Sequence, residues 1–130
     1  MNCPECGDDV IAFAVEPALH EYLPGEESGA ALCPHCLIVR PVSDPSTGSP
    51  DFTPLGDAFP AEGDAAVPMA LLLGLLSSLA LYREEIAALL ERVERAGVDP
   101  LLVIDRLDDD PSIESEVDLD RRRHQLEQLL

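Results

Sequence analysis

The chain has 130 residues, enough for one domain or for a small module joined to a helical piece. Its 26 acidic residues outnumber eight basic ones, all of them Arg, and the formal net charge is −18. This charge excludes long-range attraction to nucleic acid. Because aromatic residues make up only 4% of the chain, any core must consist of Leu, Val, Ile and Ala.

Two strand-like runs occupy the first third of the chain, at residues 10–15 and 37–42. Both are rich in Val and Ile, which favour short β-strands, so we expect a β-hairpin. Residues 19–32 between them are predicted to form a loop, with Pro24 and Gly25 in a turn. Residues 1–42 are therefore predicted to form one small module.

Residues 43–66 are crowded with Pro, Gly, Ser, Thr and Asp, a composition that predicts a linker without regular structure. The linker carries Phe52, Leu55 and Phe59. Because aromatic residues are so scarce, we expect the two Phe side chains to pack the linker against the helices. A loose tether is the alternative.

A long helix is predicted over residues 68–96, with Pro68 in its first turn and Gly97 after its end. Its stripe of apolar residues has a helical period: Leu72, Leu75, Leu79, Tyr82, Ile86, Leu89 and Val93. The first half is apolar all round, so the rest of the chain or a second copy must cover it. Because the stripe continues past the first charged residues, we interpret the uncharged run 65–82 as a buried helix and not as a membrane span.

A second helix is predicted to begin after Asp99 as N-cap, with Pro100 at its first position, and to end before Pro111. A last helix is predicted over residues 112–129. Residues 67–130 would then form a bundle of about three helices. The fold class predicted for the whole chain is α+β.

The four cysteines of the chain form two C-P-x-C units, Cys3–Cys6 and Cys33–Cys36. Two residues between the thiols let the backbone fold so that both sulfurs face one ion, and Zn²⁺ favours four such ligands in a tetrahedron. Pro stiffens each turn, and Gly7 permits a left-handed residue after the first unit. We therefore predict a Zn²⁺ site made of Cys3, Cys6, Cys33 and Cys36. Iron and a thiol–disulfide pair are the alternatives.

With these residues the first third of the chain resembles a zinc ribbon of the C-P-x-C-G kind, and the acidic, Lys-free remainder resembles small haloarchaeal zinc-finger proteins. The resemblance implies that the four cysteines are the zinc ligands, and it implies no particular activity. One departure is Leu37, which stands where the second unit would have Gly. A left-handed Leu costs on the order of 1 kcal/mol, so we expect the second turn to be less regular.

Other polar residues give weaker signals. His35 is interpreted as a turn residue and not a ligand, because four cysteines already complete a zinc site. Arg121, Arg122 and Arg123 form the only basic cluster and could contact the phosphates of a nucleic acid. The alternative for this cluster is local ion pairing on a helix, Asp118 with Arg122 and Arg123 with Glu127.

The absence of Lys beside so many acidic residues predicts a halophilic cytoplasm as the setting. Molar salt shortens the Debye length to about 3 Å and screens the self-repulsion of such a chain. An acidic interaction surface at ordinary salt is the alternative. The chain also starts without the basic and apolar regions of a secretory signal, and paired C-x-x-C units inside cells are typically metal ligands. We therefore expect a cytoplasmic protein.

A closed four-thiolate site leaves no position for water or substrate, so the predicted zinc is structural. We expect a non-enzymatic zinc-binding protein that acts as an adaptor or interaction module. Its partner would be another protein, or a second copy bound through the Leu-rich helix 68–96; we expect neither nucleic acid nor a membrane to be the partner. The alternatives are a nucleic-acid-associated regulator and a thiol or zinc-dependent enzyme.

Overall fold

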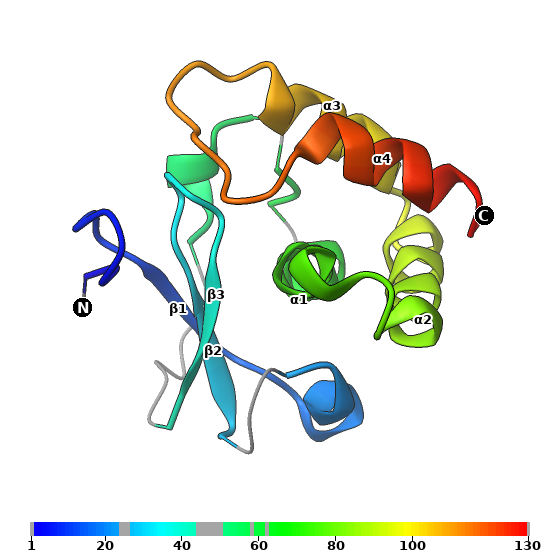
Figure 1. The fold of residues 1–130 in the computed structure, drawn as a ribbon. Helices are drawn as coiled ribbons and strands as arrows, with labels where there is room; N and C mark the ends of the chain where they lie inside the picture. The colour runs from blue at the N-terminus through cyan, green and yellow to red at the C-terminus, as the bar shows by residue number, and fades with distance from the viewer. Residues whose placement is uncertain (1, 24–26, 44–50, 58, 62, 130) are drawn as a thin grey trace.

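A computed structural model describes residues 2–23, 27–43, 51–57, 59–61 and 63–129. A three-stranded antiparallel sheet lies on one side of the molecule and the helices lie on the other, with α1 between the sheet and α2 (Figure 1). The sheet has the order β1-β2-β3, with β1 (Ile11–Ala14), β2 (Gly29–Leu32) and β3 (Val39–Val42). The α-helices are α1 (Gly63–Leu75), α2 (Arg83–Arg95), α3 (Pro100–Asp108) and α4 (Leu119–Glu127), and the short 3₁₀ turns are η1 (Pro17–Tyr22), η2 (Thr53–Leu55) and η3 (Leu76–Ser78). The predicted α+β class is confirmed, with four helices in the described ranges where about three were expected.

The central strand β2 falls inside the stretch predicted as loop. Its sequence, Gly-Ala-Ala-Leu, has little intrinsic strand preference, but all four residues are buried. Small side chains suit a strand that is covered on both faces. Pro41 lies in the edge strand β3, where its missing N–H is tolerated. The predicted turn at Pro24 and Gly25 lies outside the described residues.

The helix predicted over residues 68–96 is divided into two helices. The helix α1 starts at Gly63 and ends at Leu75, the turn η3 follows, and α2 begins at Arg83. Pro68 lies inside α1 and not in its first turn. The break lets the chain turn so that α2 packs against α1 with Ile86, Leu89, Leu90 and Val93 buried. The chain itself thus covers the first half of the stripe, because Leu71, Leu72, Leu73 and Leu76 are all buried.

The helix α1 also packs closely on the edge strand β3. A Cβ atom built on Gly74 would lie only 2.8 Å from the Cβ atom of Val39. Only Gly therefore fits at this crossing without a shift of the helix or the strand. This contact fixes how near the helices lie to the end of the sheet that carries the cysteines.

The predicted start of α3 is confirmed, because the Asp99 side chain accepts hydrogen bonds from the amides of Leu101 and Leu102, at 3.0 and 3.3 Å. The last helix, in contrast, begins at Leu119 and not at residue 112. Asp118 caps it by accepting from the Arg121 amide at 3.1 Å. Residues 112–117 are not helical, because their backbone is engaged by the sheet end of the molecule, as described below.

The residues from the predicted linker that the structure describes contribute to the main core. Phe52, Leu55 and Phe59 are buried, and the Phe52 ring lies 5.5 Å from that of Phe13 in β1 and 5.0 Å from that of Phe59, centroid to centroid. One apolar cluster extends from Ile11 to Leu126 and draws on the sheet and on all four helices. The domain boundaries near residues 42 and 66 stay predictions. Among the helices of the described ranges, none combines the length and apolar character that a membrane crossing needs.

Candidate metal centre

Strand register brings the two cysteine units together. Ile11, at the start of β1, pairs with Leu32 at the end of β2. Residues 3–7 precede β1 and residues 33–37 join β2 to β3, so both segments lie at the same end of the sheet. We call residues 3–7 the first knuckle and residues 33–37 the second knuckle.

The two knuckles share one backbone hydrogen-bond pattern. In each, the first Cys donates its amide to the carbonyl five residues later, and the residue four positions after that Cys donates back to its carbonyl. The four bonds are Cys3 N–H to Asp8 O at 2.8 Å, Gly7 N–H to Cys3 O at 2.8 Å, Cys33 N–H to Ile38 O at 3.0 Å and Leu37 N–H to Cys33 O at 2.9 Å. Because the backbone pattern repeats, each pair of thiols has the same orientation relative to its own knuckle.

The expectation of a less regular second knuckle is wrong. Leu37 has φ 62° and takes the left-handed conformation that Gly7, with φ 82°, takes in the first knuckle. This conformation costs a Leu residue about 1–2 kcal/mol. The Leu37 side chain is buried in the main apolar core, and burial of a Leu contributes about 2 kcal/mol, so that burial offsets the strain.

The four sulfur atoms form one cluster, in which all lie within 4.8 Å of one another. The Sγ atoms of Cys3 and Cys36 are 3.7 Å apart, and those of Cys6 and Cys33 are 3.3 Å apart. Both distances exceed the ~2.05 Å of a disulfide bond, and all four cysteines are free thiols. A tetrahedron with Zn–S bonds of ~2.3 Å has S···S edges of about 3.8 Å. The donor set and its spacing therefore fit a four-coordinate, thiophilic metal ion.

The surroundings shift the thiol pKa values in opposite directions. The backbone amide of Cys6 is the main reason that the pKa of Cys3 is lowered to about 7. The backbone amide of Asp8 also lowers the pKa of Cys6. The hydrogen bond between the Cys6 and Cys33 side chains, together with desolvation, outweighs this effect and raises the pKa of Cys6 to about 11. Burial raises the pKa of Cys36. Four thiolates at this spacing repel one another, so a bound cation is what would hold all four in the deprotonated form.

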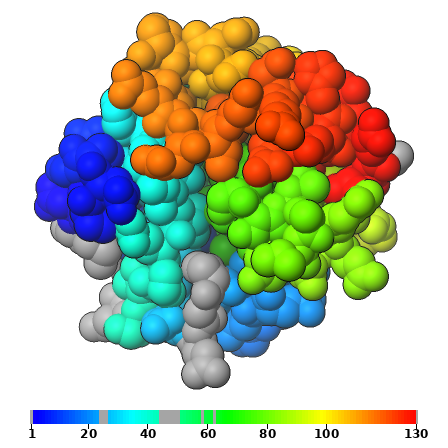
Figure 2. All heavy atoms as spheres, viewed as in Figure 1, coloured from blue at the N-terminus to red at the C-terminus, as the bar shows by residue number. Residues whose placement is uncertain are grey.

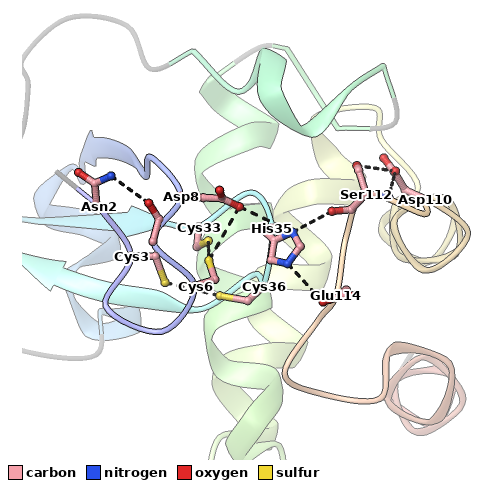
Figure 3. A network of polar contacts seen from close by, with 11 residues as sticks. Asn2, Cys3, Cys6, Asp8, Cys33, His35, Cys36, Asp110, Ser112 and Glu114 are labelled. Atoms are coloured by element: carbon pink, nitrogen blue, oxygen red, sulfur yellow. Dashed lines mark hydrogen bonds and ion pairs between the residues drawn. The ribbon is translucent and has the colours of Figure 1, made fainter.

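His35 lies beside the sulfur cluster but does not belong to it, as Figure 3 shows. Its Nδ1 atom is 3.0 Å from the carbonyl oxygen of Ser112 and 3.7 Å from a carboxylate oxygen of Asp8. Its Nε2 atom is 3.4 Å from a carboxylate oxygen of Glu114. The side chain therefore links Asp8, the residue after the first knuckle, to the segment between α3 and α4.

Backbone hydrogen bonds attach this same segment to the second knuckle. The amide of Glu114 donates to the His35 carbonyl at 2.7 Å, and the amide of Glu116 donates to the Cys36 carbonyl at 3.1 Å. In Figure 1 the chain between α3 and α4 accordingly passes over the end of the β2–β3 hairpin. The helix predicted from residue 112 leaves this contact out. In the structure Ile113, Ser115 and Val117 are half-buried and the residues between them are exposed, an alternation typical of extended chain.

The three arginines of the basic cluster have different surroundings. Arg123 forms the expected ion pair with Glu127 and a second one with Asp105, at 2.6 Å. Arg122 donates to the side-chain oxygen of Gln125 at 2.8 Å. Arg121 is exposed. The expected pairing of Asp118 with Arg122 through their side chains is replaced by the helix cap described above.

The chain belongs to DUF6276, a family of unknown function whose model matches residues 2–130. The match covers the cysteine cluster and the helices together. No curated protein and no solved structure shows a significant match to the chain. The chemistry of the site therefore has to be argued from its own residues.

Proposed function

We propose that this member of DUF6276 binds one Zn²⁺ ion through Cys3, Cys6, Cys33 and Cys36, and that the metal has a structural role. The observation that carries the proposal is the cluster of four thiols within 4.8 Å, presented by two knuckles with the same backbone pattern. Thiolate sulfur is a preferred ligand of Zn²⁺, and four protein ligands complete its tetrahedron. When bound, the ion would supply a cross-link between two segments that are far apart in the sequence.

The cross-link would extend beyond the sheet. The second knuckle holds residues 112–117 through the two backbone hydrogen bonds to Glu114 and Glu116, and α4 follows that segment directly. A metal that fixes Cys33 and Cys36 would therefore also fix the carbonyl groups that position the start of α4. This supports a role for zinc in joining the N-terminal sheet to the C-terminal helices.

The same site is poorly suited to catalysis. Four thiolates around one divalent cation leave a net charge of −2 and no free coordination position, which disfavours activation of a water molecule. We propose a non-enzymatic adaptor or interaction protein. The excess of acidic residues and the lack of Lys support a halophilic cytoplasm as its setting.

Metal content tests the assignment of zinc. The protein purified without added metal should contain one zinc and no iron per chain by mass spectrometry of the elements. Cys3→Ser and Cys36→Ser should each lose the bound zinc, because a site with three thiolates holds the ion far less tightly. His35→Ala is the matched control, since His35 lies inside the second knuckle and outside the sulfur cluster; it should keep its zinc. Iron in the purified protein, or zinc retained by both Cys variants, would contradict the assignment.

Thiol alkylation separates the structural site from a thiol enzyme. Cys6 is the exposed member of the cluster, so it is the thiol that a reagent would reach first. If all four cysteines bind zinc, iodoacetamide should modify none of them in the loaded protein and all four after chelation and unfolding. Rapid modification of Cys6 in the loaded protein would favour the thiol enzyme instead.

A further inference from the structure

A hollow of about 590 Å³ lies between the start of α2 and the helix α4. The residues that line it come from the α1–α2 connection with the first residue of α2, and from α4 with the residues just after it, and they include Leu79, Arg83, Asp120, Arg121, His124 and Leu129. Figure 2 shows these two segments side by side on one face of the molecule. The hollow thus has apolar residues from both segments and a polar rim that includes two Arg side chains.

Two large exposed apolar residues are neighbours in the sequence of residues that line this hollow. Leu81 is 80% exposed and Tyr82 is 40% exposed, and they lie in the chain between Leu79 and Arg83, which both line the hollow. The remaining Leu side chains of α1 and η3 are buried against this chain's own elements. Among the described residues, the other exposed large apolar side chain is Leu102, on α3. A neighbouring pair of exposed Leu and Tyr side chains, with Arg beside them, is typical of a protein contact.

Charged residues of both signs line the hollow. Arg40, Arg92, Arg95 and Arg123 each form an ion pair with an acidic residue. Within the described residues, Arg83, Arg106, Arg121 and Arg122 form none, and two of these four, Arg83 and Arg121, line the hollow. Asp120 lines the hollow together with Arg121, its neighbour in the sequence. The surface therefore carries both signs of charge side by side.

We propose that a second copy of this chain covers the hollow in a two-fold symmetric dimer. Leu81 of each copy packs into the hollow of the other, against Leu79 and Leu129. Arg83 and Arg121 of each copy face Asp120 of the other copy. A two-fold interface requires one surface to complement itself, and this surface combines a projecting side chain with a hollow and cations with anions.

A second copy explains the surface better than a small ligand does. Sites for small molecules enclose most of their ligand, whereas this hollow has the exposed Leu81 and Tyr82 beside it. The net charge of −18 on each copy gives the dimer a distinctive property. Because the two copies repel each other at long range, added salt should strengthen the dimer by screening that repulsion. The proposal does not depend on the zinc assignment.

Sedimentation equilibrium of the full, metal-loaded chain tests the proposal at low and at molar salt. Concentrations up to about 1 mM detect even a dissociation constant in the micromolar to millimolar range. We expect a monomer–dimer equilibrium that shifts toward dimer as salt rises. A chain that stays monomeric at every concentration and salt would overturn the proposal.

Two matched pairs of variants locate the interface. Leu81→Asp should weaken the dimer about tenfold or more, as expected for a central apolar contact, while Leu102→Asp places the same change on α3 and should leave the dimer unchanged. Arg121→Glu should weaken it several-fold more than Arg106→Glu, which makes the same change of charge at an exposed position of α3. Circular dichroism should show native helix content in all four. A dimer that survives Leu81→Asp, or that is weakened equally by the variants and their controls, would show that the interface lies elsewhere.

Discussion

Residues 3–7 and residues 33–37 bend the chain with the same backbone hydrogen bonds, yet they sit in different environments. In the first knuckle all residues after Cys3 are exposed, and a Cβ atom added to Gly7 would meet no other atom within 4 Å. In the second knuckle Cys33, Cys36 and Leu37 are buried, and two of its carbonyls accept hydrogen bonds from the segment before α4. One knuckle lies on the surface and the other is part of the core.

This difference separates what the metal would stabilise from what packing already stabilises. Apart from the cysteines, the first knuckle is attached to the rest of the protein by exposed polar contacts, such as the Glu5–Arg40 ion pair at 3.1 Å, and exposed ion pairs contribute at most about 1 kcal/mol. The second knuckle has the Leu37 side chain in the core and the backbone bonds to residues 112–117. The metal should therefore matter most for the first knuckle.

Removal of the metal should produce the largest effect and should act unequally on the two knuckles. After chelation, the amides of Cys3 and Gly7 should exchange with deuterium at least ~100-fold faster, because the first knuckle opens locally. The amides of Cys33 and Leu37 should keep most of their protection, and the helical signal should remain. Equal loss of protection in both knuckles would contradict the asymmetry.

Leu37→Ala tests whether burial of its side chain stabilises the second knuckle. Ala keeps the left-handed conformation but loses most of the buried side chain, so the free energy of unfolding should fall by about 3 kcal/mol. Gly7→Ala is the comparison in the first knuckle. It adds only the left-handed penalty of about 1 kcal/mol, because its Cβ atom meets nothing. Urea unfolding of the zinc-loaded proteins measures both, and equal losses would argue against a core role for Leu37.

Gly74→Ala tests the packing of α1 on the strand that follows the second knuckle. The added methyl group would clash with Val39, whose Cβ atom is 2.8 Å away, so we expect a loss of about 2 kcal/mol. Combining it with Val39→Ala should recover part of that loss, and the two effects should not be additive. Gly63→Ala, in the first turn of the same helix, has open space around the new Cβ atom and should be nearly neutral. A neutral Gly74→Ala would show that the crossing of α1 and β3 is looser than described.

His35→Ala should have the smallest effect. The variant removes the contacts of the ring with Ser112 and Glu114, but the backbone bonds of the same segment remain. The side chain is 31% exposed, so the loss should be at most about 1 kcal/mol. Thermal unfolding at constant zinc and salt measures it. A loss as large as that for Leu37→Ala would mean that His35, and not the backbone, holds the segment before α4.

The sequence predicted a structural feature correctly where a short motif specifies that feature by itself. The C-P-x-C spacing predicted that the four thiols would meet, and Asp99 followed by Pro100 predicted the start of α3. The strands β1 and β3 were likewise visible in their Val and Ile content. These motifs act through neighbouring residues, so their structure does not depend on contacts with distant segments of the chain.

The missed features depend on contacts between distant segments. The strand β2 is built of Gly and Ala, whose small size makes sense only when both faces are covered. Ile113 and Val117 fit a helical spacing as well as an extended one, and the hydrogen bonds to the second knuckle decide between them. The cost of a left-handed Leu37 led to the wrong expectation of a less regular second knuckle, because the place of its side chain in the core was not visible in the sequence.

The zinc assignment is tested most directly by X-ray absorption spectroscopy at the zinc edge, on the protein as purified in high salt. If both knuckles bind one ion, the spectrum should show a single shell of four sulfur atoms at ~2.3 Å. The His35→Ala variant should give the same spectrum. A shell containing nitrogen or oxygen, or fewer than four sulfur atoms, would contradict the account in which the two knuckles close one structural site.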